Sequence, residues 1–76
     1  MDKYILVSGA YGGLGISTVS KLLSNGYKVI CVDKVIKTPN ENTINFEVDI
    51  TNKDSINNIY EELVSMNIKL YSIVNL

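Results

Sequence analysis

The stretch Ser8-Gly9-Ala10-Tyr11-Gly12-Gly13-Leu14-Gly15 decides the fold of this chain. It follows the apolar run Tyr4-Ile5-Leu6-Val7 and precedes a run with helical periodicity, Ile16 to Asn25. Glycines let the backbone turn tightly and approach an anion, and a helix N-terminus offers unpaired N–H groups and the positive end of a dipole. The order of strand, glycine-rich loop and helix therefore predicts a phosphate-binding loop, with a nucleotide as the ligand.

Composition limits the classes of function. The 76 residues make one small domain, and 46% hydrophobic with 20% charged residues is typical of a folded globular chain. A net charge of −1, with seven lysines spread along a chain that has no arginine or histidine, argues against a nucleic-acid-binding surface. The single cysteine, Cys31, lies in an apolar run and is expected to be a core thiol. Met1-Asp2-Lys3 leads directly into the first strand, and no apolar span suits a membrane, so we expect a soluble, cytoplasmic chain without a membrane partner.

The other segments predict alternating strands and helices. Four apolar runs are expected to form strands: residues 3–8, 28–33, 45–49 and 70–76. Asn25-Gly26 is expected to end the first helix, and Pro39 with its polar neighbours argues against a regular helix over 34–42.

The second helix has the clearest periodicity. We expect Thr51 to cap it, with Asp54 at the acidic position of a capping box and Asn67 after its end. Apolar residues then recur along one face: Ile56, Ile59, Tyr60, Leu63 and Val64. The resulting element order predicts an α/β fold, a Rossmann-type parallel sheet with strand order 3-2-1-4 and helices on both faces, truncated after the fourth strand.

Asp33 adds a second feature of nucleotide binding. It ends the second strand, 20 residues after Gly13 and 18 after Gly15. An acid at this place can accept hydrogen bonds from both hydroxyls of an adenosine ribose. A glycine-rich turn or a strand-terminal acid alone is weak support, but the two at this spacing indicate a dinucleotide site.

Two other nucleotide sites share parts of this pattern. The loop that leads to Ser17 and Thr18 resembles the phosphate loop of plasmid-partitioning ATPases. That loop needs a lysine where Ile16 stands, and Tyr11 replaces its preceding signature lysine, so nucleotide hydrolysis is disfavoured. A methyltransferase site for S-adenosylmethionine also pairs a glycine turn with an acid, but its closely spaced Gly-x-Gly-x-Gly is absent.

From end to end the chain resembles the short-chain dehydrogenase/reductase family. Ser8-Gly9-x-x-x-Gly13-x-Gly15 is similar to that family's Thr-Gly-x-x-x-Gly-x-Gly loop, and Asp33 matches its ribose-binding acid. Asp49-Ile50-Thr51 is similar to the family's Asp-Val-Thr, whose acid contacts adenine, and Ile73-Val74-Asn75 resembles the start of its Asn-Asn-Ala-Gly segment. The resemblance implies that residues 1–76 are a partial NAD(P)-binding domain with these cofactor-binding residues: Gly9, Tyr11, Gly12, Gly13, Leu14, Gly15, Asp33, Asp49, Ile50 and Asn75.

Two branches of the family remain open. Leu76 stands where the second Asn would be, and it suits the extended, epimerase-like branch. The glycines at positions 9, 12 and 15 also fit that branch's Gly-x-x-Gly-x-x-Gly. Asn75 and Gly13-Leu14-Gly15 favour the shorter dehydrogenase branch.

The family's catalytic groups have no match here. The family uses a Ser and a Tyr-x-x-x-Lys, with the Tyr as acid/base while hydride passes to or from nicotinamide. Positions four residues after the five tyrosines hold other residues: Ser8, Gly15, Cys31, Val64 and Asn75. We therefore name no catalytic residue and no metal ligand. The resemblance implies the nucleotide-binding half of an oxidoreductase without its catalytic half; the alternative is a free-standing sensor or interaction module.

The cofactor and the partners can also be predicted. The 2′-phosphate of NADP would face the Asp33 carboxylate, which predicts a preference for NAD, although Lys34 would soften the repulsion. Gly12 stands where NADP-dependent family members often carry an arginine. The parent enzyme is expected to be a homo-oligomer, and the isolated chain to self-associate at the unpaired edge of its last strand.

Overall fold

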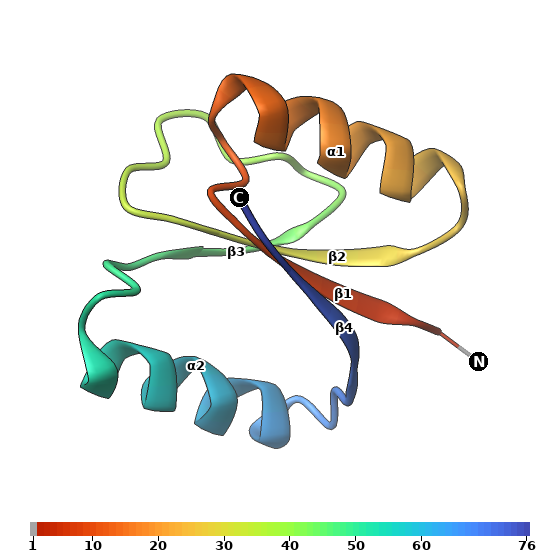
Figure 1. The fold of residues 1–76 in the computed structure, drawn as a ribbon. Coiled ribbons are helices and arrows are strands. Elements are labelled where there is room, and N and C mark those ends of the chain that lie inside the picture. Colours follow the sequence, from red (N-terminus) through yellow and green to blue (C-terminus); the bar gives the residue numbers. More distant parts are fainter. Residues whose placement is uncertain (1) are drawn as a thin grey trace.

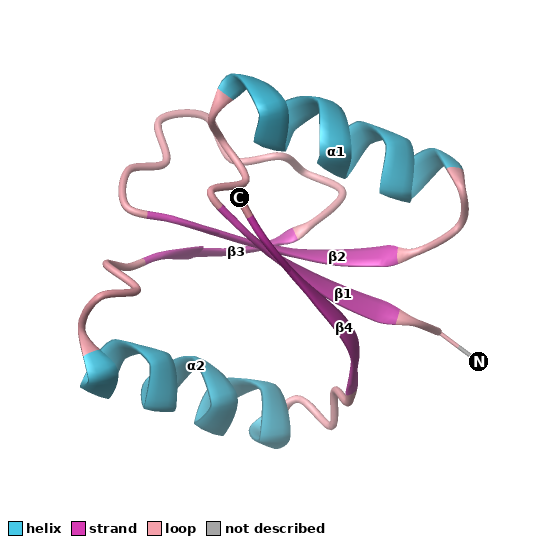
Figure 2. Cartoon of the chain, in the orientation of Figure 1, coloured by secondary structure: helices cyan, strands magenta, loops and turns pink. Residues whose placement is uncertain are grey.

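A computed structural model describes residues 2–76, and its centre is a four-stranded parallel sheet. The strands are β1 (Tyr4–Ser8), β2 (Lys28–Asp33), β3 (Ile44–Glu47) and β4 (Leu70–Asn75), in the order β3-β2-β1-β4. Helices α1 (Gly13–Ser24) and α2 (Lys53–Ser65) lie on opposite faces of this sheet (Figures 1 and 2). The predicted α/β class, strand order and placement of the helices are confirmed.

The two central strands are apolar on both faces because each face is covered by a helix. Under α1, side chains of β1 and β2 pack with this helix in one cluster: Ile5, Val7, Ala10, Val19, Val29 and Cys31. On the other face, alternate residues of the same strands pack with α2 in a second cluster: Leu6, Ile30, Val32, Ile59 and Leu63. Cys31 is 1% exposed and is a core thiol as predicted; its burial raises its pKa.

Helix α1 begins at Gly13, three residues before the predicted start. Gly12 takes the N-cap position in an extended conformation, and Gly13 and Gly15 lie in the first turn. Apolar periodicity cannot detect a first turn that contains two glycines, which explains the error. The helix ends as predicted, because Asn25 is its C-cap and Gly26 follows with φ of +88°.

Helix α2 is capped by Asn52, and the prediction that Thr51 caps it is wrong. Asn52 Oδ1 accepts hydrogen bonds from the main-chain N–H groups of Asp54 (3.0 Å) and Ser55 (3.4 Å). The Thr51 hydroxyl is engaged elsewhere, because it donates to Asp49. Asp54 therefore stands one position earlier in the helix than a capping box requires, although it still lies near the positive end of the helix dipole.

The apolar stripe of α2 is only partly covered. Ile59 and Leu63 are buried against the sheet, whereas Tyr60 and Val64 are 43% and 76% exposed. The helix is followed by Asn67, whose φ of +58° agrees with its predicted place after the helix end.

The connections between the elements differ little from those predicted. No regular helix forms over residues 34–42, as predicted. Strand β3 begins one residue earlier and ends two residues earlier than expected, so Asp49 lies in the loop after it. Within residues 2–76, neither helix has the length and apolar character that a membrane span requires.

Candidate functional site

The glycine-rich loop is bound to the carboxyl ends of two neighbouring strands. The main-chain N–H groups of Gly9 and Ala10 both donate to the Val32 carbonyl in β2, at 2.9 and 3.3 Å. On the other side, Leu76 N–H donates to the Ser8 carbonyl at 3.2 Å. The loop therefore sits where β1 lies between β2 and β4, at the switch point at which open α/β sheets bind ligands (Figure 1).

The glycines of this loop have different physical roles. Gly9 has φ of +74°, a conformation that favours glycine, and a β-carbon on it would lie 3.1 Å from the Leu76 carbonyl oxygen. A β-carbon on Gly15 would lie 2.1 Å from the Gly9 carbonyl oxygen, so this position holds α1 tightly against the loop. A β-carbon on Gly13 would meet no heavy atom within 4 Å. Gly9 and Gly15 are required by the fold, whereas Gly13 leaves open space at the start of α1.

The N-terminus of α1 is open to an anion. Across residues 2–76 no side chain forms a capping hydrogen bond to it, and its first turn holds no acidic residue. By contrast, the N-terminus of α2 is capped by Asn52 and carries Asp54. The first-turn N–H groups of α1 and its positive dipole end fit a pyrophosphate group. Leu14 is 70% exposed, so its main chain rather than its side chain suits this role.

Asp33 is held in place by two main-chain donors. Tyr11 N–H donates to Asp33 Oδ2 at 2.8 Å, and Lys34 N–H donates to Oδ1 at 2.7 Å. Each carboxylate oxygen keeps further acceptor capacity, so the half-buried acid can still accept hydroxyl donors. The contact with Tyr11 links the ribose-binding acid predicted from the sequence directly to the glycine loop.

Asp49 is fixed by the residue two positions after it. Its Oδ1 accepts from Thr51 N–H at 3.0 Å and from the Thr51 hydroxyl at 2.6 Å. The Thr51 hydroxyl is the main cause that lowers the pKa of Asp49, and Lys34 makes a smaller contribution. Lys34 Nζ lies 3.8 Å from Asp49 Oδ2, with both side chains well exposed. Asp49 is thus an exposed anion with a defined orientation.

These acids share one pocket with the glycine loop. It has a volume of about 240 Å³ and these lining residues: Gly9, Val32, Asp33, Lys34, Val48, Asp49, Ile50, Thr51 and Leu76. Four predicted site residues meet here, namely Gly9, Asp33, Asp49 and Ile50. The sequence reasoning missed the apolar walls Val32 and Val48, although each directly precedes one of the two acids.

Asn75 lies apart from this pocket. The Ser8 hydroxyl donates a hydrogen bond to Asn75 Oδ1, which joins the ends of β1 and β4. Asn75 lines a different, small cavity beside Ile59 and Tyr60 of α2. The structure therefore places this predicted site residue at the end of β4 but not beside Asp33.

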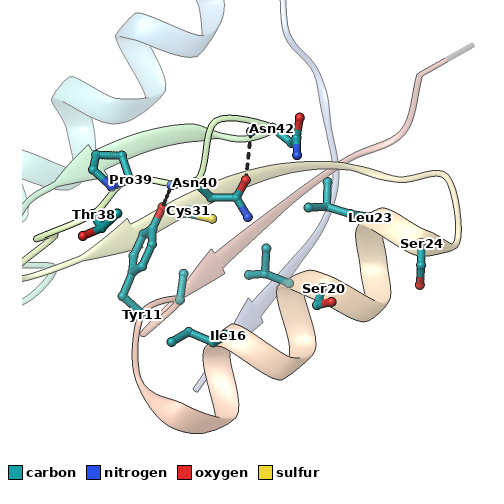
Figure 3. A pocket seen from close by; sticks show the side chains of 12 residues that line it. Tyr11, Ile16, Ser20, Leu23, Ser24, Cys31, Thr38, Pro39, Asn40 and Asn42 are labelled. Atoms are coloured by element: carbon teal, nitrogen blue, oxygen red, sulfur yellow. Dashed lines mark hydrogen bonds between the residues drawn. The ribbon is translucent and has the colours of Figure 1, made fainter.

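The main chain and the side chain of Tyr11 lie in two different regions. Its main chain contacts Asp33, but its side chain points to the far side of the loop, into a cavity of about 730 Å³ between α1 and residues 38–42 (Figure 3). Tyr11 is the one predicted site residue in the lining of this cavity. The predicted site residues Gly9, Asp33, Asp49 and Ile50 thus line the smaller pocket at the strand ends and not this cavity.

Known proteins share both the sequence pattern and the fold. The short chain dehydrogenase family matches residues 3–75. A 3-amino-tetrahydro-pyrrolizinone reductase from Xenorhabdus hominickii is 36% identical over a 78-residue alignment that covers 96% of this chain and 27% of the reductase. A short chain dehydrogenase from Leptospira borgpetersenii, solved with bound NAD+, has a TM-score of 0.88 and 28% identity over 99% of this chain and 31% of its own.

The epimerase branch is also represented. A UDP-glucose 4-epimerase from Thermotoga maritima, solved with UDP-glucose, has a TM-score of 0.77 and 28% identity over 96% of this chain and 23% of its own. The chain spans between 5% and 27% of the length of the curated relatives that it matches. The family match covers nearly all of the sequence, and the parallel sheet and glycine loop agree with it. This chain belongs to the short-chain dehydrogenase family.

Proposed function

We propose that this chain is the nucleotide-binding half of an NAD(H)-dependent short-chain dehydrogenase/reductase. The observation that carries the proposal is the contact between Tyr11 N–H and Asp33 Oδ2, at 2.8 Å, beside the uncapped start of α1. It brings an acid suited to ribose hydroxyls next to main-chain donors suited to a pyrophosphate. The bound NAD+ of the Leptospira relative supports a nicotinamide dinucleotide as the ligand. Such a cofactor supplies the donor or acceptor of a hydride.

Each part of the site has a proposed role toward the dinucleotide. The open first turn of α1, from Gly12 to Gly15, would hold the pyrophosphate through its main-chain N–H groups. Asp33 would accept from the ribose hydroxyls, and Asp49 with Ile50 would lie at the adenine. Asn75 remains a predicted contact at the end of β4.

We propose a preference for NAD(H) over NADP(H). In NADPH, the 2′-phosphate replaces a hydroxyl that Asp33 would accept from, and it brings a negative charge to the carboxylate. Two like charges about 4 Å apart repel by about 4 kcal/mol at an effective dielectric constant near 20, and by about 1 kcal/mol in water. Lys34 Nζ lies 3.8 Å from Asp49 Oδ2, so its charge is partly neutralised by that acid and offsets less of the repulsion between Asp33 and the phosphate. We expect NADH to bind at least about tenfold more tightly, which corresponds to 1.4 kcal/mol.

Calorimetric titration of the purified chain with NADH and NADPH at low salt tests both proposals. Wild-type chain should bind NADH, and Asp33→Asn should narrow the difference between the two cofactors. Glu61→Gln is the matched control, because it removes one acidic charge from an exposed position on α2. Absence of binding to either cofactor contradicts the nucleotide site. Equal affinities, or tighter NADPH, contradict the role of Asp33.

A second candidate is a free-standing nucleotide sensor or interaction module. It is favoured by one observation, that none of the five tyrosines has Lys four residues later. We prefer the oxidoreductase half because the relatives are dehydrogenases, a reductase and epimerases of greater length. A reading frame that continues into an Ala-Gly pair and a Tyr-x-x-x-Lys would separate the two. A homo-oligomeric parent, a cytoplasmic location and the dehydrogenase rather than the epimerase branch remain predictions.

A further inference from the structure

Tyr11 joins the nucleotide pocket to the connection between β2 and β3 through two separate groups. Its main-chain N–H donates to Asp33 Oδ2 on the pocket side. Its hydroxyl, on the opposite side of the loop, accepts a hydrogen bond from Asn40 N–H at 2.8 Å (Figure 3). The same hydroxyl donates to Asn45 Oδ1. A single residue thus contacts both the acid and the segment that follows it.

The partners of this hydroxyl are themselves fixed to the sheet. Asn45 lies in β3, where it is paired with Cys31 of β2. Its Nδ2 donates to the carbonyls of Asn40 (3.0 Å) and Thr43 (3.1 Å), and its Oδ1 also accepts from the Thr43 hydroxyl at 2.8 Å. The phenol of Tyr11 is therefore bound both to strand β3, through Asn45, and to the connection that precedes it, through Asn40.

We propose that Tyr11 is a positioning residue for the dinucleotide. Its hydroxyl, held by Asn40 and Asn45, fixes its main-chain N–H on the Asp33 carboxylate and so sets the direction of the ribose-binding acid. This inference rests on the proposed role of Asp33. Without the Tyr11 hydroxyl, Lys34 N–H alone orients the Asp33 carboxylate. The conformational entropy of ordering this carboxylate is then lost when the dinucleotide binds, which weakens binding.

The proposal distinguishes the phenol hydroxyl from the aromatic ring. Tyr11→Phe keeps the ring in the cavity of Figure 3 but removes the groups that bind Asn40 and Asn45. The net value of one hydrogen bond predicts that NADH binds between about 2-fold and 10-fold more weakly. The effect should disappear in an Asp33→Asn background, because the hydroxyl acts through this carboxylate.

The test combines calorimetric titration of NADH with amide hydrogen exchange measured by NMR on the same full chains. In Tyr11→Phe, the amides of residues 11 and 40 should exchange faster and NADH affinity should fall. Tyr27→Phe is the matched control, since Tyr27 packs against the same core and stacks on Tyr71 instead. Both amides and the affinity should stay at wild-type values in this control. If Tyr11→Phe does not fold, Asn45→Ala removes the acceptor while the tyrosine remains.

The outcomes separate this inference from the proposed function. Wild-type affinity in folded Tyr11→Phe overturns the positioning role, and so does an equal loss from Tyr11→Phe in the Asp33→Asn background. If the wild-type chain binds no dinucleotide, the proposed function fails. In that case the exchange rate at residue 11 still decides whether the hydroxyl holds this amide on Asp33: a faster rate supports the coupling and an unchanged rate overturns it.

Discussion

The α-carbon of Gly15 faces the carbonyl oxygen of Gly9 so closely that a β-carbon would lie 2.1 Å from that oxygen. The neighbouring atoms belong to the main chain and cannot move aside as a side chain would. We expect Gly15→Ala to lower the free energy of unfolding by about 3 kcal/mol, the upper part of the range for overpacking. Urea denaturation followed by circular dichroism measures this change.

Gly13→Ala is the matched variant for that experiment. A β-carbon on Gly13 meets no atom within 4 Å, and alanine is the better helix former. We expect wild-type or slightly higher stability together with weaker NADH binding, because the methyl group enters the space proposed for the pyrophosphate. If Gly15→Ala is as stable as Gly13→Ala, the loop and α1 can move apart at little cost in free energy, which contradicts the prediction.

Removal of the Thr51 hydroxyl should change the acid titration of Asp49. Hydrogen bonds from Thr51 lower the pKa of Asp49 below its ordinary value of 3.8, so the folded state favours the carboxylate. A lowered pKa contributes stability that is present above the unfolded pKa and is lost as the pH falls through the folded value. We expect Thr51→Val to raise the pKa of Asp49. The variant should have a lower free energy of unfolding than wild type at neutral pH, and this difference should shrink below about pH 4.

NMR titration of the Asp49 carboxyl carbon measures this shift directly. Lys34→Met is the comparison, because the charge of Lys34 is the smaller of the two contributions and its removal should raise the pKa less. A larger shift in Lys34→Met than in Thr51→Val would mean that charge, not hydrogen bonding, fixes the state of Asp49.

The outer edge of β4 should cause self-association. Strand β4 ends the sheet within residues 2–76, and Ile73 on it is 51% exposed. Unpaired main-chain groups beside apolar side chains favour pairing with another edge. Sedimentation velocity at high micromolar concentration should show assemblies that Ile73→Lys reduces. Val64→Lys adds the same charge on α2, away from the edge, and should have a smaller effect. A wild-type monomer contradicts the prediction.

The chain alone should not reduce a ketone or aldehyde with NADH. Its tyrosines lie outside any Tyr-x-x-x-Lys, so none has the lysine that the family's acid/base requires. Absorbance at the NADH band over a panel of carbonyl compounds should follow the buffer control. Turnover above this control that is lost in Gly13→Val would contradict the prediction.

The fold was predictable because its strands and the second helix carry strong periodic signals. The runs 28–33 and 70–76 are apolar enough to predict strands, of which only β2 is buried. The spacing from Gly13 to Asp33 predicts a dinucleotide site. Exact helix starts were not predictable. Thr51 and Asn52 are adjacent residues that both suit an N-cap, and the contact of Thr51 with Asp49 decides between them.

The directions of the side chains could not be predicted from the sequence either. Tyr11 and Asn45 are 34 positions apart, and no spacing rule links a loop tyrosine to a strand asparagine. Asn75 follows the expected motif, but the pleat of β4 places its side chain on the α2 side of the sheet, away from Asp33. Both outcomes depend on packing in three dimensions, which the linear pattern does not encode.

The attachment of Gly9 and Ala10 to the Val32 carbonyl has a consequence for dynamics. Val32 is 1% exposed in the central sheet, so detachment of the loop would leave the Val32 main-chain carbonyl without these two donors. Amides of ordinary surface loops exchange with solvent through small local openings. Those of Gly9 and Ala10 should instead exchange nearly as slowly as those of the strands, through openings that approach global unfolding. We therefore expect the amides of the glycine-rich loop to exchange at rates similar to those of the buried strands.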